Sequence, residues 1–157
     1  NDYVVWTLKG SALAYDTPAD LHGHKGALSD KARLTEAFDA FAQRQLTLER
    51  RSSLAQAFQA LLLGDVEYVL AGRYAGQATS QTLGITDDVR AHDQPVDQPG
   101  LFVAISHDSA CNEPWLRGQL AQKMTELPAS GLTEAAVQRN LERWKAQLKQ
   151  PVSAPKQ

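Results

Sequence analysis

Residues 61–73, LLLGDVEYVLAGR, decide the fold. The apolar end of a helix stops at Gly64, since a glycine just past a helix adopts the left-handed conformation without penalty. Residues 66–71, VEYVLA, then show the β-branched and aromatic bias of a buried strand, which stops at Gly72. A helix joined through a glycine to a strand is one unit of an α/β sheet. Ligands of such sheets bind at the carboxyl ends of the strands, so this segment predicts where a site lies.

The helix before Gly64 can be followed back to its start. Ser53 stands where an N-cap is needed, and Gln56 three residues later completes a capping-box pattern. Apolar residues recur at helical spacing and predict a face that packs on a core: Leu54, Phe58, Leu61 and Leu62.

Similar patterns predict the remaining elements. Further strands are expected at residues 3–8, 25–28, 45–49, 89–93 and 101–106. Further helices are expected after Ser29 or Asp30, from Pro114 and after Thr133, and a short helix or a turn is expected over residues 76–84. Between residues 25 and 71 the order is β-α-β-α-β, which predicts an α/β fold with parallel strands and right-handed crossovers.

Composition and charge exclude several classes of protein. The 157 residues carry a formal net charge of −2 with dispersed basic residues, so no nucleic-acid partner is expected. No apolar run approaches the ~20 residues that a membrane helix needs. Cys111 stands alone and can form no internal disulfide. The chain opens on a strand-like run rather than a leader, as a mature, cut or truncated chain would.

Four residues at strand ends are candidates for ligand binding. Ser29 and Asp30 stand where a strand becomes a helix, and backbone N–H groups there could hold a carboxylate or phosphate; the alternative is that one of them only caps the helix. Arg73 could pair with a carboxylate and Tyr74 could stack on a ligand; the alternative is an exposed loop pair.

Two clusters could suggest a metal or a catalytic pair. His22 and His24 form one, and His107, Asp108 and Cys111 form the other. Neither supplies the four converging ligands that zinc requires, and nothing orients Cys111 and His107 as nucleophile and base. Glycine-rich nucleotide motifs are absent as well. We therefore expect no metal, no cofactor and no enzymatic activity.

Three passages, taken in order, resemble the bacterial extracellular solute-binding proteins of the amino-acid-binding type (family 3). They are DLHGHKGALSDKARLTEAF (20–38), SSLAQAFQALLLGDVEYVLAGR (52–73) and LFVAISHDSACNEPWLRGQLAQKMTELPASGLTEAAVQRNLERW (101–144). The resemblance implies an α/β lobe of the type II periplasmic-binding-protein fold, joined to part of another lobe. It divides the chain into a crossing strand and loop (1–19), a second α/β lobe (20–94), the return strand and C-terminal helices of a partial first lobe (95–150), and a flexible tail (151–157).

The resemblance also implies a function. A hinged periplasmic protein would bind a small polar ligand, an amino acid or an organic acid, for an ABC importer or a sensor in the membrane. A sensing or accessory domain without a transport role is the first alternative, and a small flavodoxin-like enzyme or regulator is the second. Most of the first lobe would be missing from this chain, so we expect apolar faces such as that of Val137, Leu141 and Trp144 to drive dimerisation or strand exchange.

Two site residues follow from the resemblance. Ser29 matches the region where the second lobe meets the ligand carboxylate. Gly72 matches the position at which family members often place an aspartate for the ligand amino group, and glycine offers no charge there. Amino-acid binding in the usual mode is therefore not expected.

Overall fold

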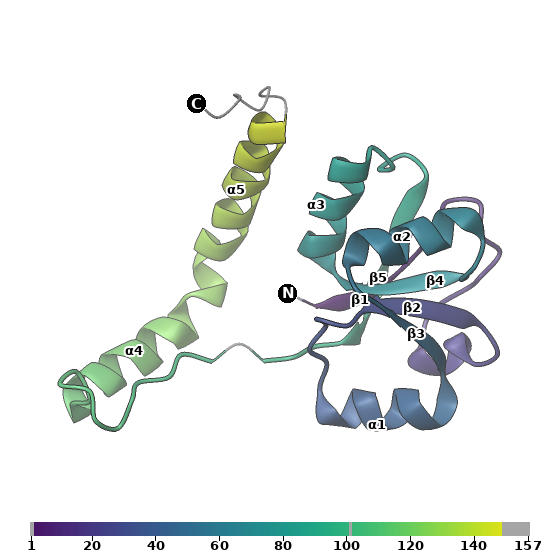
Figure 1. The fold of residues 1–157 in the computed structure, drawn as a ribbon. Coiled ribbons are helices and arrows are strands. Elements are labelled where there is room, and N and C mark those ends of the chain that lie inside the picture. The colour runs from purple at the N-terminus through teal and green to yellow at the C-terminus, as the bar shows by residue number, and fades with distance from the viewer. Residues whose placement is uncertain (1, 101, 149–157) are drawn as a thin grey trace, which may run out of the picture. The chain divides into compact units, whose positions relative to one another are not determined.

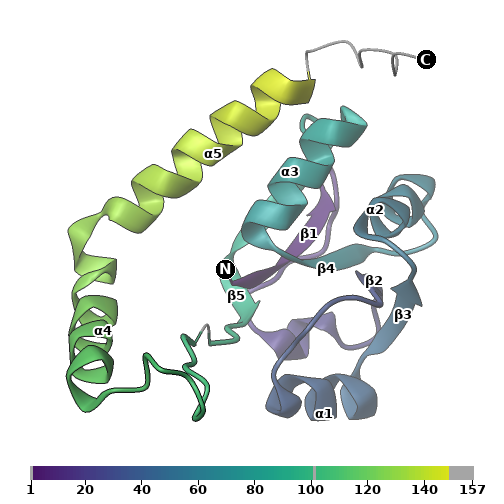
Figure 2. The ribbon, with the colours of Figure 1, turned by 60° about the vertical axis from the view of Figure 1, so that its left-hand side comes forward.

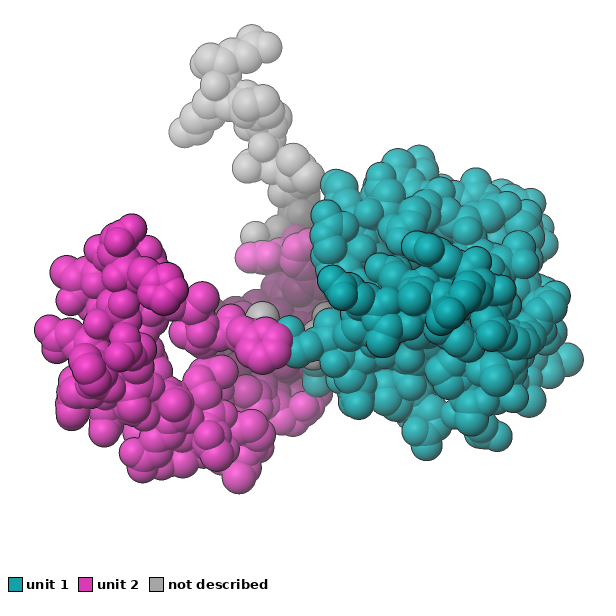
Figure 3. All heavy atoms as spheres, turned by 90° about the horizontal axis from the view of Figure 1, so that it is seen from below, with its two compact units in different colours: residues 1–100 teal, residues 101–157 magenta. Residues whose placement is uncertain are grey.

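A computed structural model describes residues 2–100 and 102–148 (Figure 1). The strands are β1 (Tyr3–Leu8), β2 (Lys25–Ser29), β3 (Thr47–Arg51), β4 (Tyr68–Gly72) and β5 (Val89–Asp97). The helices are η1 (Pro18–Leu21), α1 (Glu36–Gln45), α2 (Leu54–Leu63), α3 (Arg73–Leu83), α4 (Pro114–Glu126), η2 (Pro128–Ser130) and α5 (Leu132–Leu148). The chain forms two compact units, residues 1–100 (unit 1) and residues 101–157 (unit 2) (Figure 3).

Unit 1 is built on a five-stranded sheet in the order β3-β2-β4-β1-β5. The strands β3, β2 and β4 are parallel, as the β-α-β-α-β pattern predicted. β1 is antiparallel to both of its neighbours, β4 and β5, so the sheet is mixed. β5 lies at the edge and runs four residues beyond the predicted strand. It includes Pro95, whose missing N–H is tolerated at an edge.

Helices cover both faces of this sheet (Figure 2). Side chains alternate along β1, so Val4 and Trp6 face α2 while Val5 joins the core beneath α1. β4 lies in the middle of the sheet, with helices on both faces, so it is buried along its whole length. The predicted cap and stop of α2 are confirmed, because the Ser53 hydroxyl accepts the Gln56 N–H and Gly64 has a φ of 78°.

Unit 2 contains α4, η2 and α5. Pro114 opens α4 as predicted, and Gly131 separates the last two helices with a φ of 70°. The strand predicted at residues 101–106 is wrong for its described part, because residues 102–106 form no strand. An apolar segment becomes a strand only beside a hydrogen-bonding neighbour, and no strand of the described chain pairs with it. Residue 101 and the predicted tail lie outside the described residues.

Candidate ligand site

A pocket of about 190 Å³ opens at the carboxyl ends of β2 and β4. It is lined by Tyr3, Ser29, Lys31, Ala32, Leu54, Leu70, Ala71, Gly72 and Ala75. These residues come from β1, β2, β4, the segment after β2 and the first turns of α2 and α3. The pocket therefore lies where the sequence placed the site, at the end of the strand in residues 61–73.

Ser29 is the last residue of β2 and not a helix cap. Its hydroxyl accepts the N–H of Lys31 at 3.2 Å. α1 begins only at Glu36, and its N-cap is Thr35, whose side chain accepts the Phe38 N–H. The expected cap at Ser29 or Asp30 is thus wrong. The segment between β2 and α1 is held by tertiary contacts that the local sequence does not reveal.

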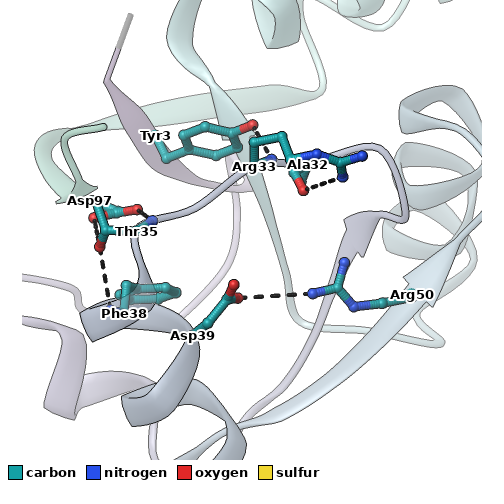
Figure 4. A network of polar contacts seen from close by, with 8 residues as sticks. All are labelled: Tyr3, Ala32, Arg33, Thr35, Phe38, Asp39, Arg50 and Asp97. Atoms are coloured by element: carbon teal, nitrogen blue, oxygen red, sulfur yellow. Dashed lines mark hydrogen bonds and ion pairs between the residues drawn. The ribbon is translucent and has the colours of Figure 1, made fainter. Parts of the chain in front are cut away.

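Those contacts form the network in Figure 4, which fixes one wall of the pocket. The Tyr3 hydroxyl accepts the N–H of Arg33 at 3.1 Å. The Asp97 carboxylate accepts the N–H of Thr35 at 2.7 Å and its hydroxyl at 2.8 Å. The end of β5 and the start of β1 therefore set the path of the chain from β2 to α1.

Gly72 ends β4 and is buried, and it is also the residue before α3. No side chain caps the first turn of α3, which begins at the pocket. Free N–H groups of a helix start carry partial positive charge and favour an anion. The Arg73 N–H is already bonded, because it donates to the Asp2 carbonyl at 2.9 Å. Gly72 thus brings the positive end of the α3 dipole to the pocket and no side-chain charge.

Arg73 and Tyr74 lie in the first turn of α3 rather than in a loop, and neither lines the pocket. The Arg73 guanidinium donates to the carbonyl oxygens of Asp93 at 2.8 Å and His92 at 3.4 Å. These hydrogen bonds hold the Arg73 side chain against β5. Asp30 is exposed and also lies outside the lining; its N–H donates to the carbonyl of Arg51.

The structure therefore brings together Ser29 and Gly72 from the predicted set, and adds Tyr3 and Lys31 to them. Sequence reasoning missed Tyr3 because only the antiparallel insertion of β1 beside β4 carries it to this edge. Lys31 follows Ser29 by two residues, so its closeness to a strand end was the signal available.

Neither of the two histidine-containing clusters forms a metal site among the described residues. His24 Nδ1 lies 2.6 Å from the Glu67 carboxylate, and that hydrogen bond is the main cause that lowers the pKa of Glu67. His22 stacks on Phe41. Cys111 is exposed, and no group of three potential metal ligands occurs among the described residues.

A further polar cluster joins β1 and β5. The Thr7 hydroxyl is fully buried and lies 3.2 Å from His92 Nε2, while the Tyr15 ring meets the His92 ring edge to face. Burial, assisted by Arg90, lowers the pKa of His92, and burial raises that of Tyr15 to about 12. Thr7 and Tyr15 are buried and His92 is half-buried, so the cluster lies largely in the interior of unit 1.

A larger apolar hollow of about 430 Å³ lies within unit 2. Its lining comes from the segment before α4 and from α4 itself, including Phe102, Ile105 and Met124. It has no strand ends and no converging backbone donors. The pocket at the ends of β2 and β4 is the better candidate because the carboxyl ends of two parallel strands and a helix start meet there.

The chain has the fold of a lobe of the type II periplasmic-binding-protein class. Among solved structures, the chain is similar to the GluR0 ligand-binding core in complex with L-glutamate, with 14% identity over 91% of this chain and 59% of that one and a TM-score of 0.55. It is similar to a mutant of ArgBP from T. maritima, with 18% identity over 92% of this chain and 58% of that one and a TM-score of 0.55. Domain 2 of ArgBP from T. maritima matches 61% of this chain along 99% of its own length, with 18% identity and a TM-score of 0.50.

These comparisons confirm the fold expected from the resemblance. No family model and no curated protein matches the chain. The chain spans 43% of the arginine-bound T. maritima ArgBP and less than two thirds of the GluR0 core. No helix within residues 2–100 and 102–148 has the length and apolar character to span a membrane.

Proposed function

We propose that this chain is part of a periplasmic solute-binding protein that takes up a small polar ligand carrying a carboxylate, an amino acid or an organic acid, for ABC-type import. The observation that carries the proposal is the pocket at the joined ends of β2 and β4, lined by Ser29 and Gly72. The shared fold supports it, since structures of that fold are described as bound to L-glutamate or arginine.

In the proposed complex the ligand carboxylate lies between Ser29 and the first turn of α3. The Ser29 hydroxyl accepts from Lys31 and can still donate its own proton to the ligand. The positive end of the α3 dipole, which begins after Gly72, adds a further attraction for the carboxylate. Arg73 acts by joining the start of α3 to β5. Asp30 and Tyr74 are adjacent in sequence to residues that line the pocket.

The test is titration of the purified chain with the common amino acids and a set of mono- and dicarboxylates, followed by amide NMR shifts. Saturable shifts at Ser29, Lys31, Gly72 and Ala75 are expected. Ser29→Ala should weaken binding about tenfold, the effect of losing a hydrogen bond to a charged group. Ser11→Ala is the matched control, since the Ser11 hydroxyl accepts the Leu13 N–H at 3.2 Å in the same local geometry, away from this pocket. Absence of shifts with every ligand would overturn the proposal.

A sensing or accessory role for the same fold is the second candidate. The lack of side-chain charge at Gly72 favours it, because a lobe with fewer ligand contacts binds more weakly. A thermal-shift screen separates the two: stabilisation by a transportable small molecule supports uptake, and no stabilisation by any of them supports the accessory role.

We further propose that unit 2 contacts another protein surface, in a second copy or a complementary lobe. Its described helices leave large side chains in solvent, with Trp115 71% and Leu132 63% exposed, while Leu141 is buried. Large apolar side chains left in solvent favour contact with another protein surface. Light scattering across a hundredfold range of concentration should show association, and a persistent monomer would contradict a contact between copies.

A further inference from the structure

The charge of the pocket lining has a single source. Of the residues that line the pocket, Lys31 alone is ionisable at neutral pH, and the rest are apolar residues, Ser29 and Tyr3. No carboxylate is among them. The neighbouring acid Asp30 is exposed and outside the lining, and Asp97 is held by Thr35.

Lys31 also differs from every other lysine in residues 2–100 and 102–148. Lys9, Lys25, Lys123 and Lys145 each have a carboxylate oxygen within 4 Å, at 3.6, 2.6, 2.7 and 2.7 Å respectively. Lys31 has no such partner among the described residues. Its backbone is nonetheless fixed, because its N–H donates to the Ser29 hydroxyl. Lys31 is exposed, and an ammonium group without a counter-ion at the edge of a pocket can hold an anion.

The surroundings reinforce this preference for negative charge. Arg33 lies two residues further along the same segment and is exposed, and its guanidinium donates only to the carbonyl of Ala32. Arg73 stands at the start of α3 with its guanidinium on β5. An ammonium group in the pocket would meet Lys31 and find no carboxylate on the lining, whereas a carboxylate would find Lys31, Ser29 and the start of α3.

We propose that Lys31 is a specificity-determining residue and that this lobe selects organic acids without an ammonium group, namely oxo-, hydroxy- or dicarboxylic acids. The Lys31 ammonium donates charge-assisted hydrogen bonds to a carboxylate of the ligand. Its flexible stem allows the compact charge to follow ligands of different length. The inference rests on the proposed binding function and narrows its ligand class.

The experiment compares 2-oxoglutarate with L-glutamate, which differ only in the group on the second carbon. Both are titrated by NMR and calorimetry into the full chain at low ionic strength. At least tenfold tighter binding of 2-oxoglutarate is expected, and the preference should shrink in 0.5 M salt because screening weakens exposed charges. Pyruvate and L-alanine form a second pair at lower total charge.

Variants then assign the preference to one residue. Lys31→Gln should weaken 2-oxoglutarate binding about tenfold and reduce the preference over L-glutamate, while Lys31→Arg keeps both. Lys25→Gln, at the opposite end of β2, is the control and should change neither. Unchanged melting temperatures establish that each variant is folded.

The outcomes separate this inference from the function on which it rests. Equal or tighter binding of L-glutamate at the same amides overturns the inference and leaves the binding function standing. An unchanged preference in Lys31→Gln overturns the role of Lys31. Failure of every carboxylate and amino acid to bind overturns both.

Discussion

At the residue scale, two glycines make room for the large aromatic rings of unit 1. A Cβ atom on Gly26 would overlap the ring of Tyr68, because the two would lie closer than van der Waals contact allows. A Cβ atom on Gly76 would overlap the Trp6 indole in the same way. Both rings are buried, Tyr68 in the core beneath α1 and Trp6 beneath α2 and α3. These glycines are required by close approach rather than by backbone conformation.

Gly26→Ala should therefore destabilise the protein by about 2 kcal/mol, the typical effect of forcing an extra carbon into a packed core. Chemical denaturation with far-UV circular dichroism measures the change. Gly10→Ala is the matched control, since no atom lies within 4 Å of its added Cβ, and it should be neutral within about 0.5 kcal/mol. Equal effects of the two substitutions would contradict the packing argument.

His92 supplies a pH dependence with a defined sign. Burial holds the pKa of His92 in the folded protein below its ordinary value. As the pH falls below the ordinary pKa, the unfolded chain therefore binds the proton more readily than the folded chain does. Stability from this group is complete above the ordinary pKa of about 6.5 and is lost as the pH falls through that value toward the folded pKa.

Urea midpoints at pH 7.5 and 5.5 measure this loss. The wild-type midpoint should fall at the lower pH, and His92→Gln should show a smaller fall because glutamine does not titrate. His107→Gln, in an exposed segment of unit 2, should keep the full wild-type fall. Parallel pH curves for wild type and His92→Gln would count against the assignment.

At the element scale, the sequence predicted what local rules decide. α2 and β4 were found because Ser53, Gly64 and the apolar periodicity between them act within one helix and the strand after it. The parallel arrangement followed from the alternation of helices and strands. The position of Gly72 at a strand end followed too, and with it the location of the pocket.

The failures share one physical cause, which is dependence on distant partners. α1 begins at Glu36 because Asp97, far along the chain, holds Thr35 as its cap. Arg73 lies in the first turn of α3 rather than in a loop, and carbonyl oxygens of β5 hold its guanidinium. Residues 102–106 have strand-like composition without a neighbouring strand. No pattern in the adjacent sequence contains these partners.

The link between β5 and α1 gives an element-scale prediction. Asp97→Ala should cost about 1–2 kcal/mol, because it removes both hydrogen bonds to Thr35 and loosens the start of α1. Hydrogen exchange should rise first in the segment between β2 and α1, next to the pocket. Asp93→Ala is the control on the same strand, since that carboxylate is exposed and lies 4.0 Å from Arg73. Equal losses of stability from both variants would refute the link.

At the scale of the whole molecule, unit 1 has the closed core of an independent domain. Its sheet is covered on both faces by helices and loops of the same unit, so the core is complete within unit 1. Residues 1–100 alone should therefore unfold cooperatively with a dispersed NMR spectrum, and should lose any self-association of the longer chain. A collapsed spectrum without dispersion would show that unit 1 depends on unit 2.

The pairing of Tyr3 with Asp97 has a consequence for how this domain can be used. Its first and last strands are neighbours, so the points at which the chain enters and leaves lie about 5 Å apart across an antiparallel ladder. A surface loop of an unrelated carrier can span that separation without distortion. Unit 1 is therefore suited to splicing into a host protein as a cassette, where occupancy of its pocket would be transmitted through two adjacent strands to a reporter.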